Sequence, residues 1–300
     1  MRVGNLHATR EIRGIALSVG SGVCFGTLAI VAKLAYDRGA EPLPLLAMRF
    51  VLATLFIAIF CRVTGRRLWP GGRAATKLLL LGGFGYGFEA SLFFLALEHA
   101  PAGVVGLIFY SFPIWTNIIG ILTGLEHPSA RVWIALAVGT VGVASIFAVS
   151  GTGLLGPILA LSAAVAVAVY MILSQIALRK QDAPTTALWT SAGAAVSVGI
   201  AALVTRSGLP ALALPHAGAL ALASAVAFLL MYESIRRIGS SRSSIANMVE
   251  PITTVLLAAL ILGEDLTVRI GIGAVLVISA LPILVSAETR REVVTPADSS

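Results

Sequence analysis

Charged side chains inside otherwise apolar stretches are the residues whose chemistry most needs an explanation. Arg49, Glu89 and Glu250 lie deep within such stretches, whereas Lys33 and Glu233 lie near the ends of theirs, where a long side chain can reach water. An ionisable group at the centre of a membrane-spanning helix costs about 2.5–3.5 kcal/mol on insertion scales. The three deep residues are therefore the first candidates for a binding site.

Two interpretations are open for each of these charges. Arg49 and Glu89 fall at similar depths when about 1.5 Å is counted per helical residue. They could therefore form an ion pair between adjacent helices, or one or both could meet a zwitterionic or charged solute. Glu250 is either a hydrogen-bonded or protonated acid, or a carboxylate that binds a proton or an ammonium group, which makes proton coupling a hypothesis for this chain.

Two prolines, Pro113 and Pro251, lie inside apolar stretches, the second directly after Glu250. Proline has no N–H to donate, so a helix that contains these residues leaves the carbonyls of Phe109 and Asn247 without their usual partners. Such carbonyls are tolerated in a membrane where they face protein or a wet cavity. Both prolines are therefore candidate hinges next to a site, and a plain packing kink is the alternative.

Aromatic residues are concentrated between residues 84 and 115, which hold nine of the 21 in the chain. Helical spacing places Tyr86, Glu89 and Phe93 on one face. This pattern predicts a cavity wall of mixed aromatic and polar character, suited to an amphipathic solute, while several of the rings are expected to face lipid. The candidate substrate-binding residues are Arg49, Tyr86, Glu89, Phe93, Tyr110, Asn247 and Glu250.

The elements that must position these residues are membrane-spanning helices. The chain has 300 residues, of which 58% are hydrophobic and 12% charged, whereas soluble domains are about 25% charged. A spanning helix needs about 20 mostly apolar residues. The breaks between apolar runs predict an all-α integral membrane protein with ten transmembrane helices, at 14–36, 43–63, 78–97, 102–123, 131–149, 154–178, 184–204, 216–235, 243–263 and 267–286.

The distribution of positive charge predicts how these helices are oriented. Short connections make neighbouring helices antiparallel, so an even number places both ends of the chain on one side. That side carries sixteen of the 21 lysines and arginines, the opposite loops carry three, and the remaining two lie within spans. The positive-inside rule then places both termini in the cytoplasm. Because topology accounts for the formal charge of +7, we expect no nucleic-acid partner.

An internal repeat divides the chain into two halves of five helices. A constant shift of 138 residues aligns three pairs: Pro113 with Pro251, Glu126 with Glu264, and Arg131 with Arg269. An odd number of helices per half forces the second half to be inverted in the membrane. Inverted repeats of this kind are the architecture of secondary transporters, with the substrate site near the bilayer midplane between the halves.

The residues after Pro251 resemble the EamA domain. An apolar run leads from this proline to Gly263–Glu264, and Arg269 and Gly273 follow in the next helix. Two such domains in tandem resemble the drug/metabolite transporter superfamily, and the resemblance covers residues 12–287, with Met48–Arg49–Phe50 included. The first copy departs from the pattern at Leu125, where glycine is usual. The predicted organisation is a cytoplasmic tail at 1–13, EamA-like repeats at 14–150 and 151–287, and a second cytoplasmic tail at 288–300.

Sequence motifs for enzymatic chemistry are missing from the predicted spans. All four histidines lie at span ends or in tails, and no span contains aspartate. There is no HExxH helix, GxSxG elbow or Walker loop. The sequence therefore argues against a metal site, a cofactor, a lipase, an intramembrane protease and an ATP-driven pump, and we expect a protein that is not an enzyme.

The repeat predicts a secondary carrier that works by alternating access. The resemblance is greatest to amino-acid and metabolite exporters of bacterial inner membranes, including aromatic amino-acid exporters, which implies export of aromatic or other neutral amino acids across the cell inner membrane. The expected partners are this substrate and membrane lipid. Carriers of sugar phosphates, nucleotide sugars or other metabolites are the main alternative, although they need several deep basic residues and Arg49 is the only one here. A channel and a lipid-modifying enzyme are the remaining alternatives.

Overall fold

The computed structural model describes residues 2–122, 153–178, 181–205, 210–247 and 249–264, together with isolated positions at 134–141, 208 and 268–279. Within these residues the chain is helical throughout, apart from short turns. The predicted fifth and tenth spans, 131–149 and 267–286, lie mostly outside the described residues, as do Glu126, Arg131 and Arg269.

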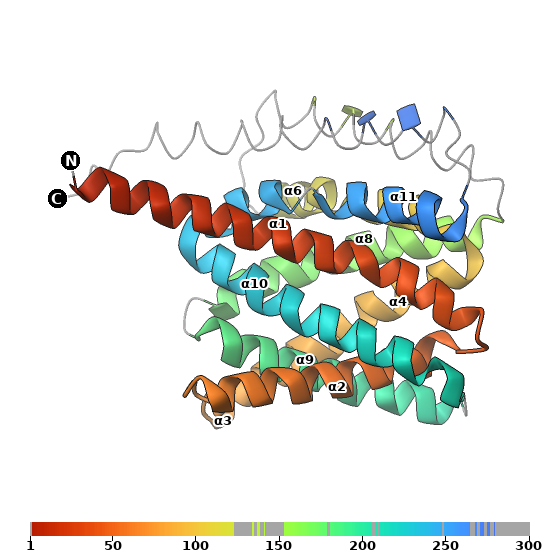
Figure 1. Ribbon diagram of the computed structural model, residues 1–300, viewed down its shortest axis with the longest axis horizontal. Coiled ribbons are helices and arrows are strands. Elements are labelled where there is room, and N and C mark those ends of the chain that lie inside the picture. Colours follow the sequence, from red (N-terminus) through yellow and green to blue (C-terminus); the bar gives the residue numbers. More distant parts are fainter. Residues whose placement is uncertain are drawn as a thin grey trace.

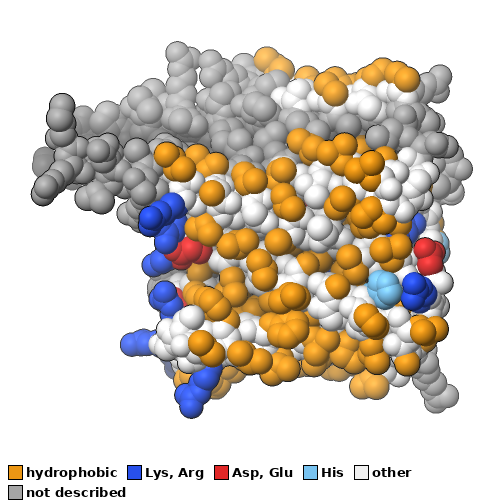
Figure 2. All heavy atoms as spheres, viewed as in Figure 1, with side chains coloured by type: hydrophobic (Ala, Val, Ile, Leu, Met, Phe, Trp, Pro, Cys, Tyr) orange, Lys and Arg blue, Asp and Glu red, His pale blue; other side chains and the backbone are white. Residues whose placement is uncertain are grey.

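Five segments of the described chain are long and apolar enough to cross a membrane, judged by length and composition. They are Ile12–Tyr36, Pro42–Val63, Gly72–His99, Ala183–Val204 and Ala211–Ser234, and Leu155–Tyr170 and Val249–Leu262 are shorter apolar helices. Large hydrophobic side chains on their outer faces are exposed, among them Leu55, Phe84 and Ile200. Figure 2 shows such side chains across the middle of the visible face, with the basic side chains gathered at its left and right ends. This is the surface of a multi-pass membrane protein.

The first two helices follow the predicted spans closely. Helix α1 (Arg2–Tyr36) extends the first span back through the predicted tail, and α2 (Pro42–Val63) begins with prolines in its first turn, where a missing N–H costs no helical hydrogen bond. In the second half, α8 (Leu155–Leu178) and α9 (Ala183–Val204) match the sixth and seventh spans within two residues at either end.

The third span is continuous but changes its winding. Helix α3 (Gly72–Leu80) leads into a π-helical segment, Leu81–Gly87, and α4 (Phe88–His99) continues from it. The glycine-rich sequence of this segment lets it pack closely on α9, where the Ser197 hydroxyl donates a hydrogen bond of 3.1 Å to the Gly83 carbonyl. Short π-helical insertions occur often at functional sites. This one carries Tyr86 and directly precedes Glu89.

Two helices break directly ahead of the candidate hinge prolines. The fourth span consists of α5 (Ala102–Phe109) and α6 (Phe112–Leu122), and in the second half α10 (Leu214–Ala246) is separated from α11 (Val249–Leu262) at Asn247. The prediction of mid-helix prolines is therefore wrong. Pro113 and Pro251 lie in the first turns of α6 and α11, where the N–H groups have no partner within the helix in any case.

The predicted loop between the eighth and ninth spans is also wrong. After a 3-10 turn at Ala211–Ala213, α10 continues through Arg236, Arg237 and Arg242 to Ala246. Arginine is a good helix former, so a basic cluster marks the edge of the membrane without ending the helix. The ninth span consequently begins at Val249, six residues later than predicted.

The helices of the two halves interleave in a symmetric pattern. The first helices of the two halves are α1 and α8. Helix α1 packs on α10 and α11 of the second half, and α8 packs correspondingly on α4 and α6 of the first half. The pair α2–α9 joins equivalent helices of the two halves, and α5–α11 joins the first part of the fourth span to the second part of its counterpart in the other half. In Figure 1, α1 runs from left to right and its counterpart α8 from right to left, and α10 likewise runs opposite to α3 and α4. Exchanging the halves therefore maps α1–α10 onto α8–α4, α1–α11 onto α8–α6, and α2–α9 onto itself.

Candidate functional site: the central cavity

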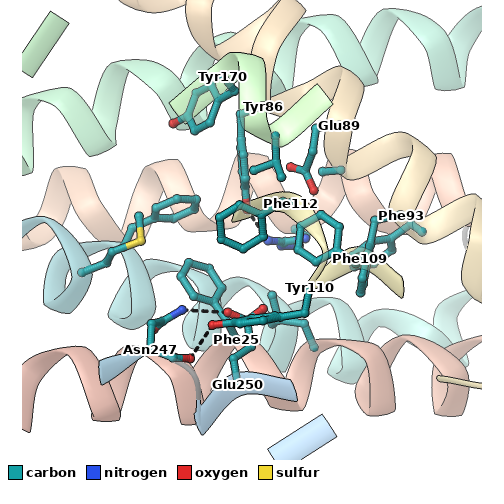
Figure 3. Close-up of a pocket in the computed structure, with 17 residues that line it drawn as sticks. Phe25, Tyr86, Glu89, Phe93, Phe109, Tyr110, Phe112, Tyr170, Asn247 and Glu250 are labelled. Atoms are coloured by element: carbon teal, nitrogen blue, oxygen red, sulfur yellow. Dashed lines mark hydrogen bonds between the residues drawn. The ribbon is translucent and has the colours of Figure 1, made fainter. Parts of the chain in front are cut away.

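A cavity of about 120 Å³ lies between the two halves. This volume is several times what one water molecule requires. All seven candidate substrate-binding residues line it: Arg49 from α2, Tyr86 from the π-helical segment, Glu89 and Phe93 from α4, Tyr110 from the break between α5 and α6, Asn247 from the break after α10, and Glu250 from α11. Figure 3 shows Glu89 and Glu250 on opposite sides of this space, with rings between them.

Arg49 is buried and held by the protein. Its side chain is 2% exposed. The Nε atom donates to the Ser224 hydroxyl at 2.6 Å, and one terminal nitrogen donates to the Tyr86 hydroxyl at 2.9 Å. The guanidinium carbon also lies 4.9 Å from the ring centre of Phe50 and 5.2 Å from that of Phe94. These are cation–π distances, so the charge is stabilised by rings as well as by hydroxyl groups.

The ion pair, which was one of the two interpretations of Arg49 and Glu89, is not formed: the salt bridges in the described part of the chain join Glu98 to His99, and Glu233 to Arg236 and Arg237. The equal-depth argument was correct in bringing both residues to one cavity. It did not indicate that the Arg49 guanidinium would instead donate a hydrogen bond to the hydroxyl of Ser224, on a helix of the other half. Of the two interpretations, the direct ion pair is therefore wrong.

Glu89 enters the cavity without a partner for one of its oxygens. Its side chain is 4% exposed, and its Oε2 atom is buried without a hydrogen bond to any described residue. A buried polar atom that lacks a partner is rare in folded proteins, and each instance asks for an explanation. Because it lies at a cavity wall, this oxygen is accessible to a group that enters the cavity.

Polar atoms at the second helix break are linked to one another. The Asn247 Nδ2 atom donates to Glu250 Oε2 at 2.8 Å, and the Tyr110 hydroxyl donates to the Asn247 carbonyl at 2.7 Å. The Glu250 N–H also donates to that carbonyl, at 2.9 Å. The Asn247 carbonyl expected to lose its helical partner has thus gained two others, and these bonds fix the orientation of the Glu250 carboxyl group.

Aromatic rings form most of the remaining wall. Phe109 lies 4.9 Å from Phe93 and 5.9 Å from Phe112, measured between ring centres. Across the cavity Phe228 contacts Phe25 at 5.3 Å and Tyr86 at 4.9 Å, in edge-to-face geometry. Aromatic pairs in such geometry stabilise packing beyond the area they bury. The cavity therefore has rigid apolar walls with a few fixed polar groups, as small-molecule sites do.

Several lining residues were missed by the sequence reasoning. They are Phe25, Tyr170, Phe228 and Met231, and Ser224 was missed as the partner of Arg49. Tyr170 could have been identified from the sequence, because a tyrosine hydroxyl inside a membrane needs a hydrogen-bond partner. In the structure the Tyr170 hydroxyl lies 3.1 Å from the Tyr232 hydroxyl. Phenylalanine and serine within an apolar helix carry no comparable signal.

The described residues contain no cluster of histidine, cysteine or acidic side chains that could hold a metal ion. What the cavity offers is one base that is already bonded, two carboxyl groups, hydroxyls and rings. Such a set can bind an amphipathic solute and orient its charged groups.

The comparisons with known proteins agree with this architecture. Relatives include an uncharacterized transporter of Archaeoglobus fulgidus, 24% identical over 90% of this chain and 95% of its own length, and the uncharacterized transporter YcbK of Bacillus subtilis, 29% identical over 84% of this chain and 86% of its own length. A solved crystal structure aligns with a TM-score of 0.67 over 93% of this chain and 98% of its own, at 18% identity, which shows a shared fold. The model of the EamA-like transporter family matches residues 12–148 and 154–286. The chain therefore belongs to the EamA-like transporter family, as a membrane protein with two EamA repeats.

Proposed function

We propose that this transporter exports amino acids, aromatic or other neutral ones, across the cell inner membrane by alternating access between its two repeats. The observation that carries this proposal is the central cavity, where Arg49 and Glu89 of the first repeat and Glu250 of the second face one space walled by rings. A substrate bound there contacts both repeats, so its binding can depend on how they are arranged.

The composition of the cavity supports a zwitterionic, amphipathic substrate. Carboxyl groups at Glu89 and Glu250 suit the ammonium group of an amino acid, and the Arg49 region supplies positive potential for its carboxylate. Rings such as Phe93 and Phe109 suit an apolar or aromatic side chain. Sugar phosphates and nucleotide sugars fit less well, because two acids repel a phosphate and the single base is already bonded to Ser224 and Tyr86.

Alternating access requires that one end of the cavity be closed while the other opens. At one end, the Glu264 carboxylate after α11 accepts hydrogen bonds from the Ala102 and Gly103 N–H groups at the start of α5, at 2.6 and 2.9 Å. This contact joins the second repeat to the first. We propose that it closes that end, and that the breaks ahead of Pro113 and Pro251 are the hinges about which the helices move.

The charge distribution supports an orientation with both termini in the cytoplasm. Arg236 and Arg237 follow the eighth span, on the side that the positive-inside rule assigns to the cytoplasm. Figure 2 shows the larger group of basic side chains at the left end of the visible face. The Glu264 contact is at the opposite end of α11 from Asn247, and thus on the outer side.

The test is counterflow in proteoliposomes that contain the purified full-length protein. Vesicles loaded with an unlabelled amino acid should accumulate the labelled one transiently, and a panel of neutral and aromatic amino acids should give saturable flux. A channel would give flux without counterflow. Flux of sugar phosphates without flux of any amino acid would contradict the proposal.

A further inference from the structure

The charges in the central cavity are unbalanced in a way that the amino-acid proposal does not require. Glu89 and Glu250 are two acids, and in the described part of the chain neither has a basic side chain within 4.0 Å. Among the described residues that line the cavity, Arg49 is the one base. A buried acid is costly unless it is neutralised or paired, so the cavity as built favours a positively charged occupant.

One edge of the Arg49 guanidinium is already occupied by hydroxyl groups of the protein. Two of its nitrogens donate to Ser224 and Tyr86, and its guanidinium carbon lies over the rings of Phe50 and Phe94. Carboxylate recognition by arginine gains most from a bidentate contact with two free N–H groups. Arg49 would have to give up a hydrogen bond of 2.6 or 2.9 Å to one of these partners to make a contact on that side.

The two acids face the same cavity from the two repeats. Glu89 has a buried oxygen without a partner in the described chain, whereas Glu250 is held in place through the Asn247 amide. In Figure 3 the space between them is bordered by Phe109 and Phe112, whose ring centres are 5.9 Å apart. Ring faces attract an ammonium group electrostatically, and more strongly where water is excluded.

We propose that Glu89 and Glu250, with the rings of Phe109 and Phe112, form an ammonium subsite, and that a substrate carboxylate is dispensable for binding. The substrate class then widens from amino acids to small organic amines that carry an aromatic or aliphatic group. This inference rests on the proposed function, because it assumes that the cavity is the substrate site. One acid comes from each repeat, so the ammonium group bridges the halves.

The test is isothermal titration calorimetry on the purified full-length protein with three probes that share a phenethyl group. Phenethylamine carries only the ammonium group, L-phenylalanine carries both charges, and 3-phenylpropionate carries only the carboxylate. We expect phenethylamine to bind at least as tightly as phenylalanine, and 3-phenylpropionate at least about tenfold more weakly than the amine, since a hydrogen bond to a charged group is worth that much. Equal or tighter binding of 3-phenylpropionate overturns the proposal.

Variants locate the subsite within the protein. Glu89→Gln and Glu250→Gln should each weaken phenethylamine binding about tenfold or more, and Glu89→Asp, which keeps the charge, should restore part of it. Glu98→Gln is the matched control, because Glu98 lies on the same helix as Glu89 with its side chain 48% exposed outside the cavity. Unchanged amine binding in folded Glu89→Gln and Glu250→Gln overturns the proposal.

Counterflow separates this inference from the proposed function. If labelled phenylalanine shows counterflow while phenethylamine does not bind, the ammonium subsite is wrong and the amino-acid transporter stands. If phenethylamine binds in a manner that depends on Glu89 and no amino acid is transported, the subsite stands and the amino-acid proposal falls.

Discussion

The two helix breaks beside the cavity have the same position in their repeats and different chemistry. The shift of 138 residues that aligns Pro113 with Pro251 places Phe109 on Asn247 and Phe112 on Glu250. All four residues line the cavity. The first break therefore presents two rings where the second presents an amide and a carboxyl group.

The two repeats thus share the position of the break and differ in the side chains that they place beside the cavity. Both breaks leave backbone groups that must find hydrogen-bond partners inside a membrane protein. At the second break this is done partly from the first, because the Tyr110 hydroxyl donates to the Asn247 carbonyl. The first, apolar break thus helps to hold the geometry of the second, polar break.

The largest effect is expected from Glu250→Gln at the polar break. It removes the charge but keeps the shape, so transport should fall about tenfold or more, the range for losing a hydrogen bond to a charged group. Only the ionised carboxylate attracts an ammonium group, so wild-type affinity should decrease as the pH is lowered through the titration of this group. The Glu250→Gln variant should lose this pH dependence of affinity, because an amide side chain does not gain or lose a proton as the pH is changed.

The measurement is initial flux and substrate affinity in proteoliposomes at a series of pH values. Glu98→Gln, exposed at the end of α4, is the control and should keep the wild-type profile. A Glu250→Gln variant with wild-type flux at every pH would remove Glu250 from the site.

A somewhat smaller effect is expected from Asn247→Ala. The Glu250 carboxyl group loses the amide that orients it at 2.8 Å, so KM should rise by about tenfold at most while kcat changes less. The equivalent change at the apolar break, Phe109→Leu, keeps an apolar wall and should alter KM by only about twofold to fivefold. Equal effects of both substitutions would mean that the breaks are not chemically distinct in the way proposed here.

Tyr110→Phe tests the bond that joins the two breaks. Removing the hydroxyl leaves the Asn247 carbonyl with the Glu250 N–H alone, at a cost of about 1 kcal/mol, and flux should fall about fivefold or less. Tyr36→Phe is a matched control, since its hydroxyl also donates to a carbonyl, that of Phe94 at 2.8 Å, but does not line the cavity. If both variants lose thermal stability alike and only Tyr110→Phe loses flux, the link between the breaks is functional. If neither loses flux, it is not.

The smallest effect on binding is expected from Glu264→Gln, which lies outside the cavity. An amide can accept only one of the two hydrogen bonds from Ala102 and Gly103, so the proposed outer closure weakens while the affinity of the isolated site stays within about twofold of wild type. Reactivity of an engineered cysteine in the cavity toward an outside reagent should increase. Unchanged reactivity would show that this contact does not control access.

Much of this arrangement could be predicted because membranes make certain residues conspicuous. Arg49, Glu89 and Glu250 stand out from apolar surroundings by cost alone, and the structure brings them to one cavity. Their role in binding a substrate stays a prediction. The break at Asn247 and the continuation of α10 past Arg236 were not predictable in the same way. A basic cluster reports where the membrane ends, which need not be where a helix ends.

The partners of Arg49 illustrate the second limit. Ser224 is one small polar residue in an apolar helix of the other repeat, and nothing in its local sequence indicates that it receives a guanidinium group. Phe228 and Phe25 are likewise indistinguishable from lipid-facing rings until the helices are packed. Contacts between repeats depend on helix rotation, which periodicity alone does not fix when apolar residues occur on every face.

The central claim is that one cavity between the repeats is reached from each side of the membrane in turn and holds the substrate. It is tested most directly by Phe112→Cys in a protein whose Cys24 and Cys61 are replaced by alanine, with a membrane-impermeant maleimide applied to one face of oriented vesicles at a time. We predict labelling from either face, and protection from both by a saturating transported amino acid. Labelling that no transported substrate prevents would contradict the account.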